Sequence, residues 1–218
     1  MNFSYANELI LREKNFEIAH GRPENTWYLF HNHVFGAAEV ARAVADLAGM
    51  DANLAYFSAL LHDIGKIREK HEQRFHGVLG YEMLKEENAD VARACLVHTF
   101  PFNRLESFEH CRKMFFDRRE DYETTAAFIR SHPLNDYDLL VQMADGLANA
   151  YGLVTIEERA AEYASRHGID VPPGMLESMK DYFDRKIGVD VYTLFDRVAA
   201  KDIFIAVPAG GGVFSSAG

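Results

Sequence analysis

The chain has 218 residues, of which 48% are hydrophobic, and a formal net charge of -10. This composition supports one sizeable core, and the absence of any run of 18 apolar residues argues against a membrane span. The negative surface repels polyanions, so we expect neither a nucleic-acid polymer nor a membrane as partner. A small phosphorylated substrate stays compatible, because a bound cation would set the local field.

Helical spacing of apolar residues dominates the chain. Helices are predicted at 4–18, in a short segment capped by Asn25 and Thr26, at 33–48 and at 51–61. Gly49 and Asp51 are expected to end one of these helices and to cap the next. Gly65 is expected to let the chain turn, and the polar residues 68–72 predict an exposed connection.

The second half of the chain continues the pattern, with predicted helices at 76–87, 89–98, 121–131, 136–151, 155–167, 173–186 and 190–200. Residues 203–207, IFIAV, are the only strand candidate. The class is therefore predicted to be all-α.

Only two cysteines occur, Cys95 and Cys111, so we expect no disulfides. The amino terminus lacks the apolar stretch of a signal peptide, and we therefore expect a cytoplasmic protein.

Six side chains stand out because they lie inside or at the ends of apolar helical segments: His33, His62, Asp63, His76, His98 and Asp145. Burying such groups without partners is costly, and a metal ion is one partner that could serve several of them. The other histidines lie in polar surroundings or face elsewhere, and we expect no metal at His20, His31, His71, His110, His132 or His167.

The pair His62-Asp63 closes the apolar segment AYFSALLHDIGK. Adjacent helical residues point about 100° apart, yet both can reach one ion near the helix end. An imidazole nitrogen and a carboxylate oxygen suit Fe, Mn, Co, Ni, Zn or Mg. The dipeptide alone is more typical of a histidine at a helix end whose neighbouring aspartate binds backbone.

Five segments in order decide between these interpretations: HVFGAAEVARAVADLA, ALLHDIGK, HGVLGYEML, LVHTF and VQMADGLANAYG. Together they resemble the HD-domain superfamily of metal-dependent phosphohydrolases, in its HDIG-type subgroup, over roughly residues 30–152. The resemblance implies a helical bundle. It divides the chain into an N-terminal extension (1–28), the metal-binding core (29–152), a C-terminal helical region packed on the core (153–206) and a flexible tail (207–218).

By position, the resemblance implies that His33, His62, Asp63 and Asp145 hold a first divalent metal. His76 and His98 match the additional ligands of subgroups with a second metal, which Asp63 would bridge. Positions on the metals would stay open for water and substrate.

The implied reaction is hydrolysis of a small phosphate ester or anhydride, a nucleotide or related compound, by metal-activated water. Asp63 and Lys66 are the predicted catalytic residues, and Lys66, Arg68 and Arg104 the predicted substrate-binding residues. Dinucleoside polyphosphates are one substrate class of the family. Opening of cyclic dinucleotides is not assigned, because that subgroup has a double histidine where this chain has His98-Thr99.

Two alternatives have different chemistry. A few relatives with the same six ligands use two irons as oxygenases, and an HD module can also be regulatory and non-catalytic. Residues 103–120 and 153–205 are expected to shape the mouth of the pocket or the surface of a homodimer, and the sequence leaves both open.

Overall fold

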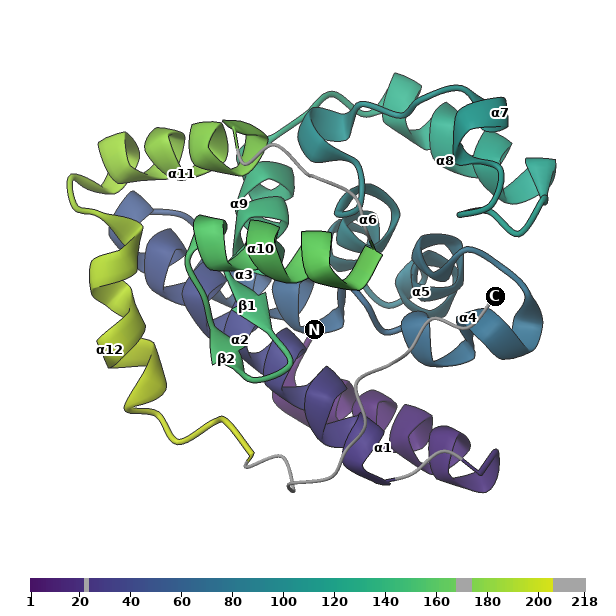
Figure 1. Cartoon of the computed structure of the whole chain (residues 1–218), viewed down its shortest axis with the longest axis horizontal. Coiled ribbons are helices and arrows are strands. Elements are labelled where there is room, and N and C mark those ends of the chain that lie inside the picture. Colours follow the sequence, from purple (N-terminus) through teal and green to yellow (C-terminus); the bar gives the residue numbers. More distant parts are fainter. Residues whose placement is uncertain (22–23, 168–173, 206–218) are drawn as a thin grey trace.

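The computed structural model describes residues 1–21, 24–167 and 174–205 (Figure 1). The helices are α1 (Phe3–Ala19), α2 (Glu24–Ala48), α3 (Ala52–Leu61), α4 (Lys66–Glu72), α5 (His76–Leu84), α6 (Ala89–Val97), α7 (Phe108–Cys111), α8 (Arg119–Ser131), α9 (Asp136–Gly146), α10 (Ile156–His167), α11 (Gly174–Ile187) and α12 (Phe195–Ala199). Short 3-10 turns occupy Pro101–Asn103 and Val191–Leu194. Strands β1 (Ala148–Asn149) and β2 (Gly152–Leu153) form an antiparallel hairpin.

The all-α prediction is confirmed, since this hairpin is the only sheet among the described residues. No helix in the described ranges combines the length and apolar character that a membrane span needs. The predicted flexible tail, 207–218, lies outside the described residues.

Helix α2 is the centre of the core. Its alanines Ala37, Ala38, Ala41 and Ala45 are fully buried. Their small side chains allow close approach by α3 and α9, both of which pack on α2, while α6 packs on α3. The predicted boundary between α2 and α3 is confirmed. Gly49 has a φ of +67°, and Asp51 caps α3 by accepting hydrogen bonds from the amides of Asn53 and Leu54.

A second apolar cluster lies between α5, α6 and the segment that precedes α8. It is built of Phe75, Val78, Leu96, Val97, Phe100, Cys111 and Phe115. The buried Asp121 of α8 closes it by accepting hydrogen bonds from the amide of Phe75 and the guanidinium of Arg74. Helices α7 and α8 therefore form a lobe beside α5 and α6, in the upper right of Figure 1.

Two predicted boundaries near the amino end were wrong. The short helix capped by Asn25 and Thr26 and the helix at 33–48 are one continuous helix, α2, because no proline lies between Pro23 and the end of α2 at Ala48. Residues 68–72 are helical and not an irregular connection, although Lys70, His71 and Glu72 are exposed as predicted. Arg68 and Glu69 are half-buried, and Arg68 pairs with the buried Glu13 of α1.

Two further predictions were wrong in the C-terminal half. Helix α9 ends at Gly146 rather than at 151. The hairpin follows it because the Asn149 side chain accepts hydrogen bonds from the amides of Tyr151 and Gly152 and thereby stabilises the turn. Residues 203–205 of the strand candidate form no strand, and the rest of that candidate lies outside the described residues. Helix α11 packs on α9 and α2.

Candidate metal centre

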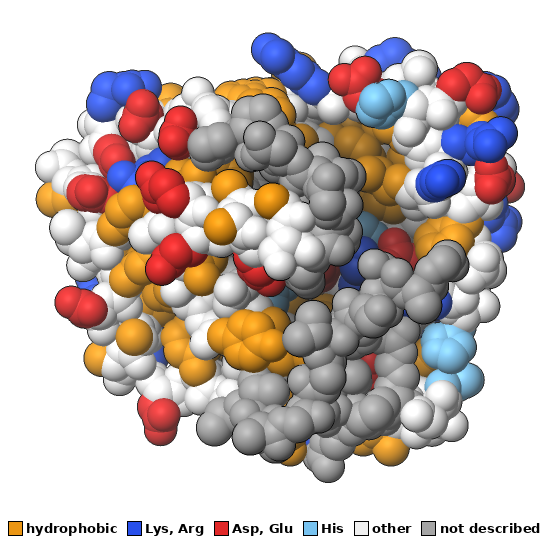
Figure 2. Space-filling model, in the orientation of Figure 1, with side chains coloured by type: hydrophobic (Ala, Val, Ile, Leu, Met, Phe, Trp, Pro, Cys, Tyr) orange, Lys and Arg blue, Asp and Glu red, His pale blue; other side chains and the backbone are white. Residues whose placement is uncertain are grey.

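The six predicted ligands come from five helical elements and meet at one place. His33 lies on α2, His62 and Asp63 follow α3, His76 opens α5, His98 follows α6 and Asp145 lies near the end of α9. Because each helix end or face is fixed by packing in the core, residues far apart in the sequence converge. Figure 2 shows histidine, basic and acidic side chains together in a hollow of the face that it presents.

Three of the four imidazoles are anchored through Nδ1 on backbone carbonyl oxygens: His33 on Ala148 at 2.9 Å, His62 on Ala59 at 2.6 Å, and His98 on Ala94 and Cys95 at 3.1 and 3.0 Å. A carbonyl oxygen only accepts, so Nδ1 holds the ring proton in each case. The Nε2 lone pair of all three rings is therefore directed to the centre, as a metal ligand requires.

The fourth imidazole, His76, is anchored on a side chain instead. Its Nδ1 lies 2.7 Å from Glu69 Oε1, and the other oxygen of Glu69 is 3.1 Å from Lys66 Nζ. A carboxylate behind a histidine orients the ring and makes it a stronger ligand. Helix α4 thus supplies the support for a ligand on α5.

His33, His62 and Asp145 form what we call the first half of the centre. Asp145 Oδ1 lies 3.2 Å from His33 Nε2 and 3.7 Å from His62 Nε2. Asp63 Oδ2 faces the same group, 3.8 Å from His33 Nε2 and 3.9 Å from His62 Nε2. The ligand atoms of His33, His62 and Asp145 all lie within 4.8 Å of one another, close enough to surround one ion, and those of His62, Asp63 and His98 form a second such group.

His76 and His98 form the second half. Their Nε2 atoms are 3.2 Å apart, and each lies 3.3 Å from Asp63 Oδ1. Asp63 therefore turns one oxygen to each half, which is the arrangement of a carboxylate that bridges two ions.

The chemistry of the donors fits a divalent metal. The His62 side chain is 0% exposed, and its Nε2 has no hydrogen-bond partner among the described residues. Burial lowers the pKa of His62 to about 4, so the ring is neutral with a free lone pair. A buried acceptor without a partner is costly, and a cation resolves that cost. Four imidazole nitrogens and two carboxylates suit borderline metals such as Fe, Mn, Co, Ni and Zn.

The two carboxylates are ionised. Burial alone would raise the pKa of Asp63 and Asp145, yet both pKa values are lowered. When the rings of His98 and His33 are protonated at both nitrogens, they donate hydrogen bonds through Nε2 to Asp63 and Asp145, and these bonds, with the charges of the neighbouring rings, outweigh burial. A neutral ring that keeps its proton on Nδ1 offers the Nε2 lone pair instead. The same contacts raise the pKa of His33 and His98 against the effect of burial.

Of the three predicted substrate-binding cations, only Lys66 lies at the metal centre. Lys66 lies beside the second half, and its side chain is 47% exposed. Burial disfavours the ammonium, but Asp63 and Glu69 outweigh it and raise the pKa of Lys66. Arg68 is directed to α1, where it pairs with Glu13 at 2.7 Å, and the exposed Arg104 lies over the ring of Phe102.

The remaining histidines of the described residues lie away from the metal centre. His31 stacks on Phe35 and contacts the carbonyl of Ile203 through Nε2. The rings of His20 and His71 contact each other at the surface in a tilted arrangement, and His110 and His132 are exposed. The side chain of His167 lies outside the described part of the chain.

Gly65 is required for a different reason from the one predicted. Its φ of -71° suits any residue, so conformational freedom is not what selects glycine here. A Cβ at this position would lie 2.1 Å from the carbonyl oxygen of His76 and 2.7 Å from the amide of Gly80. Close packing of the α3–α4 junction on α5 therefore leaves no room for a side chain, and this contact sets where His76 lies relative to Asp63.

Sequence reasoning missed three residues of the site. Glu69 was part of a charged run that was interpreted as exposed. Thr99 places Oγ1 3.1 Å from His98 Nε2 and 3.4 Å from His76 Nε2. Arg159 of α10 brings Nη2 to 3.9 Å from Asp145 Oδ1. Only Glu69 had a signal in the sequence, since it follows Lys66 at a spacing of one helical turn.

Comparison with known proteins gives one family and a small set of relatives. Ribonuclease Y of Fusobacterium nucleatum is 26% identical over 173 residues, which are 78% of this chain and 31% of that protein. The ribonucleases Y of Mycoplasma capricolum and Mycoplasma mycoides are each 40% identical over 58 residues, 27% of this chain and 11% of those proteins. The chain therefore spans less than a third of the length of these relatives. Comparison with solved structures gives no significant match.

The HD-domain family model matches residues 30–150, the segment that contains all six predicted ligands. The predicted family is confirmed by this match. The predicted domain boundaries remain predictions. This chain belongs to the HD-domain family, a superfamily of metal-dependent phosphohydrolases.

Proposed function

We propose that this protein hydrolyses a small phosphate ester or anhydride, a nucleotide or a related compound, with water as the nucleophile. The observation that carries the proposal is the buried Nε2 of His62, which has no partner among the described residues and lies within a cluster of metal-ligand atoms. The family supports the class of reaction. The class of substrate is our inference from the net charge of the chain.

The two halves supply the ligands for two ions. His33, His62 and Asp145 would hold one, His76 and His98 the other, and Asp63 would bridge them. A bound divalent ion supplies a Lewis acid that polarises phosphoryl oxygens and makes water acidic enough to attack near neutral pH.

The residues of the chain account for the remaining requirements. Asp63 and Asp145 stay ionised, so either can accept a hydrogen bond from the attacking water and orient it toward phosphorus. Lys66 keeps its positive charge beside Asp63 and is half exposed, so its ammonium can offset charge on the phosphoryl oxygens. Arg68 and Arg104 are weaker candidates, because their guanidinium groups lie against Glu13 and Phe102.

The net charge of -10 supports a small substrate, since a long polyanion would be repelled outside the centre. The relatives are named ribonucleases, which supports cleavage of phosphate diesters as one candidate reaction. A short diester and a mononucleotide therefore both belong among the compounds tested.

The test combines metal analysis of the purified protein with turnover of phosphate monoesters, diesters, nucleotides and dinucleoside polyphosphates. We expect metal-dependent release of phosphate or of a phosphorylated product, which falls to the uncatalysed background in Asp63→Asn. Asp46→Asn, at an exposed position of α2, is the matched control and should keep full activity. Turnover that is independent of Asp63, or oxygen consumption by an iron-loaded protein without phosphate release, would overturn the proposal.

A further inference from the structure

Arg159 reaches the metal centre from a helix outside the matched HD domain. Helix α10 begins at Ile156, whereas the match ends at residue 150. The Arg159 side chain is only 19% exposed, and its Nη2 lies 3.9 Å from Asp145 Oδ1. An arginine at this depth beside a metal ligand needs an explanation, because its charge repels the cations that the centre would hold.

The guanidinium is held in place by a chain of contacts. Nη1 donates to Glu162 Oε2 at 3.1 Å, and the same oxygen accepts from Asn149 Nδ2 at 3.3 Å. Asn149 is buried and organises the hairpin whose Ala148 carbonyl anchors His33. Arg159 is thereby fixed relative to the first half of the centre.

One end of the guanidinium remains available to a ligand. Nη2 is beyond hydrogen-bond distance of Asp145 Oδ1, and it makes no hydrogen bond among the described residues. Glu162 binds Nη1, so Nη2 keeps donors that face the centre. A planar guanidinium with free donors next to bound cations matches the oxygens of a phosphoryl group.

We propose that Arg159 binds a phosphoryl oxygen of the substrate at the metal centre. Lys66 adjoins the second half from α4 and Arg159 adjoins the first half from α10, so a phosphoryl group at the two ions meets a cation from each side. The identity of the ligand rests on the proposed function. The position of Arg159 also makes the C-terminal region part of the binding site instead of a separate appendage.

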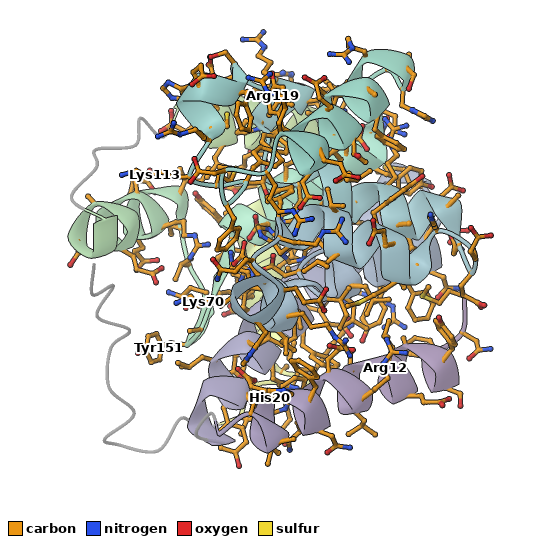
Figure 3. All side chains as sticks on the ribbon, turned by 90° about the vertical axis from the view of Figure 1, so that its right-hand side faces the viewer. Arg12, His20, Lys70, Lys113, Arg119 and Tyr151 are labelled. Carbon is orange, nitrogen blue, oxygen red and sulfur yellow. The ribbon has the colours of Figure 1, made fainter. Side chains whose placement is uncertain are left out.

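The test measures binding of inorganic phosphate to the metal-loaded protein by calorimetry, with metal content determined in parallel. Arg159→Ala should raise the Kd for phosphate by about tenfold to a hundredfold, because a charge-assisted hydrogen bond is lost. Arg159→Lys keeps the charge, so its Kd for phosphate should lie between those of the wild type and Arg159→Ala. Arg119→Ala, on the distant α7–α8 lobe in Figure 3, is the matched control and should bind phosphate like the wild type.

Several outcomes decide the assignment. Unchanged phosphate binding in Arg159→Ala, or no phosphate binding by the wild type, overturns it. So does a loss of metal with phosphate binding restored by excess metal, because Arg159 would then only position Asp145. If the wild type turns over no ester but binds phosphate through Arg159, the proposed function fails and the assignment of Arg159 stands. If the wild type turns over an ester and Arg159→Ala leaves both the KM and the phosphate Kd unchanged, the proposed function stands and the assignment of Arg159 fails.

Discussion

The histidines of the first half of the metal centre are anchored on backbone, whereas one histidine of the second half, His76, depends on a side chain of a short helix. The rings of His33 and His62 donate to carbonyl oxygens, which no substitution can remove directly. The ring of His76 is oriented by Glu69 on the seven-residue helix α4. The position of α4 in turn depends on the pair of Arg68 with Glu13 of α1. The first half is thus fixed by the fold, and the second can be tuned by single residues.

The largest expected difference between the halves is in metal content. His62→Ala should lose the ion of the first half and all hydrolytic activity, because this ligand lies closest to the core. His76→Ala should keep one ion per chain and lose the other. Metal analysis of both purified variants, with His110→Ala as an exposed control, measures this. Equal metal loss in both variants would contradict two separable halves.

The next largest expected effect is on the stability of the chain and arises where the α3–α4 junction packs on α5, between the two halves of the centre. Gly65→Ala would place a methyl group against backbone of α5, so we expect a loss of about 3 kcal/mol or more in the free energy of unfolding. Gly174→Ala is the control, since a Cβ at Gly174 meets no atom within 4 Å and the helix favours alanine. Denaturant unfolding of the two variants compares them. A similar stability for both would show that α5 can shift away from the α3–α4 junction.

A smaller effect is expected from the support of His76. Glu69→Gln keeps the shape of the side chain but removes its charge, so the affinity of the second half for metal should fall by about tenfold to a hundredfold. The affinity of the first half should not change. Competition with a chelator measures both affinities, and Glu86→Gln at an exposed position serves as control. If the affinities of both halves for metal fall together, Glu69 supports the whole centre and not only His76.

The smallest effect concerns acid stability away from the centre. A hydrogen bond from Lys186, assisted by Tyr182, lowers the pKa of Asp136 and ties α11 to the start of α9. A lowered pKa means that this contribution is present above the ordinary aspartate pKa, about 3.9, and is lost as the pH falls through the folded value.

Asp136→Asn should therefore lower the stability of the metal-free chain near pH 7 by less than about 1 kcal/mol, since 39% of the Asp136 side chain is exposed. The difference from the wild type should disappear in strong acid. Urea unfolding at both pH values measures it, with Asp181→Asn on the exposed face of α11 as control. A difference that grows on acidification would have the wrong sign for this contact.

Much of the centre could be predicted because its ligands interrupt apolar helices. His62 and Asp63 end a segment whose other residues are buried, and such a polar pair indicates chemistry at the level of sequence. The order of the five segments then predicted the other ligands by resemblance. The all-α class followed from helical spacing in the same segments.

The parts that could not be predicted depend on packing between distant elements. Glu69 lies in a charged run that is typical of a solvated surface, and only the pairing of α4 with α1 and α5 brings it behind His76. Arg159 lies on an amphipathic helix without a motif, and the turn at Asn149 brings that helix to the centre. The spacing of Lys66 and Glu69 indicates a pair on one helical face, but it does not indicate that α4 approaches His76, and no spacing indicates the approach of α10.

The separation of the ligands along the chain has a consequence for folding kinetics. His33 and the carbonyl of Ala148 that orients it are 115 positions apart, whereas His76 and His98 are 22 positions apart. Closing a longer loop costs more chain entropy, and contacts between distant positions form more slowly. We therefore expect the second half to assemble from local contacts, while the first is complete only after α2 and the hairpin have met. Capture of an ion by the first half would then mark the end of folding of the whole domain.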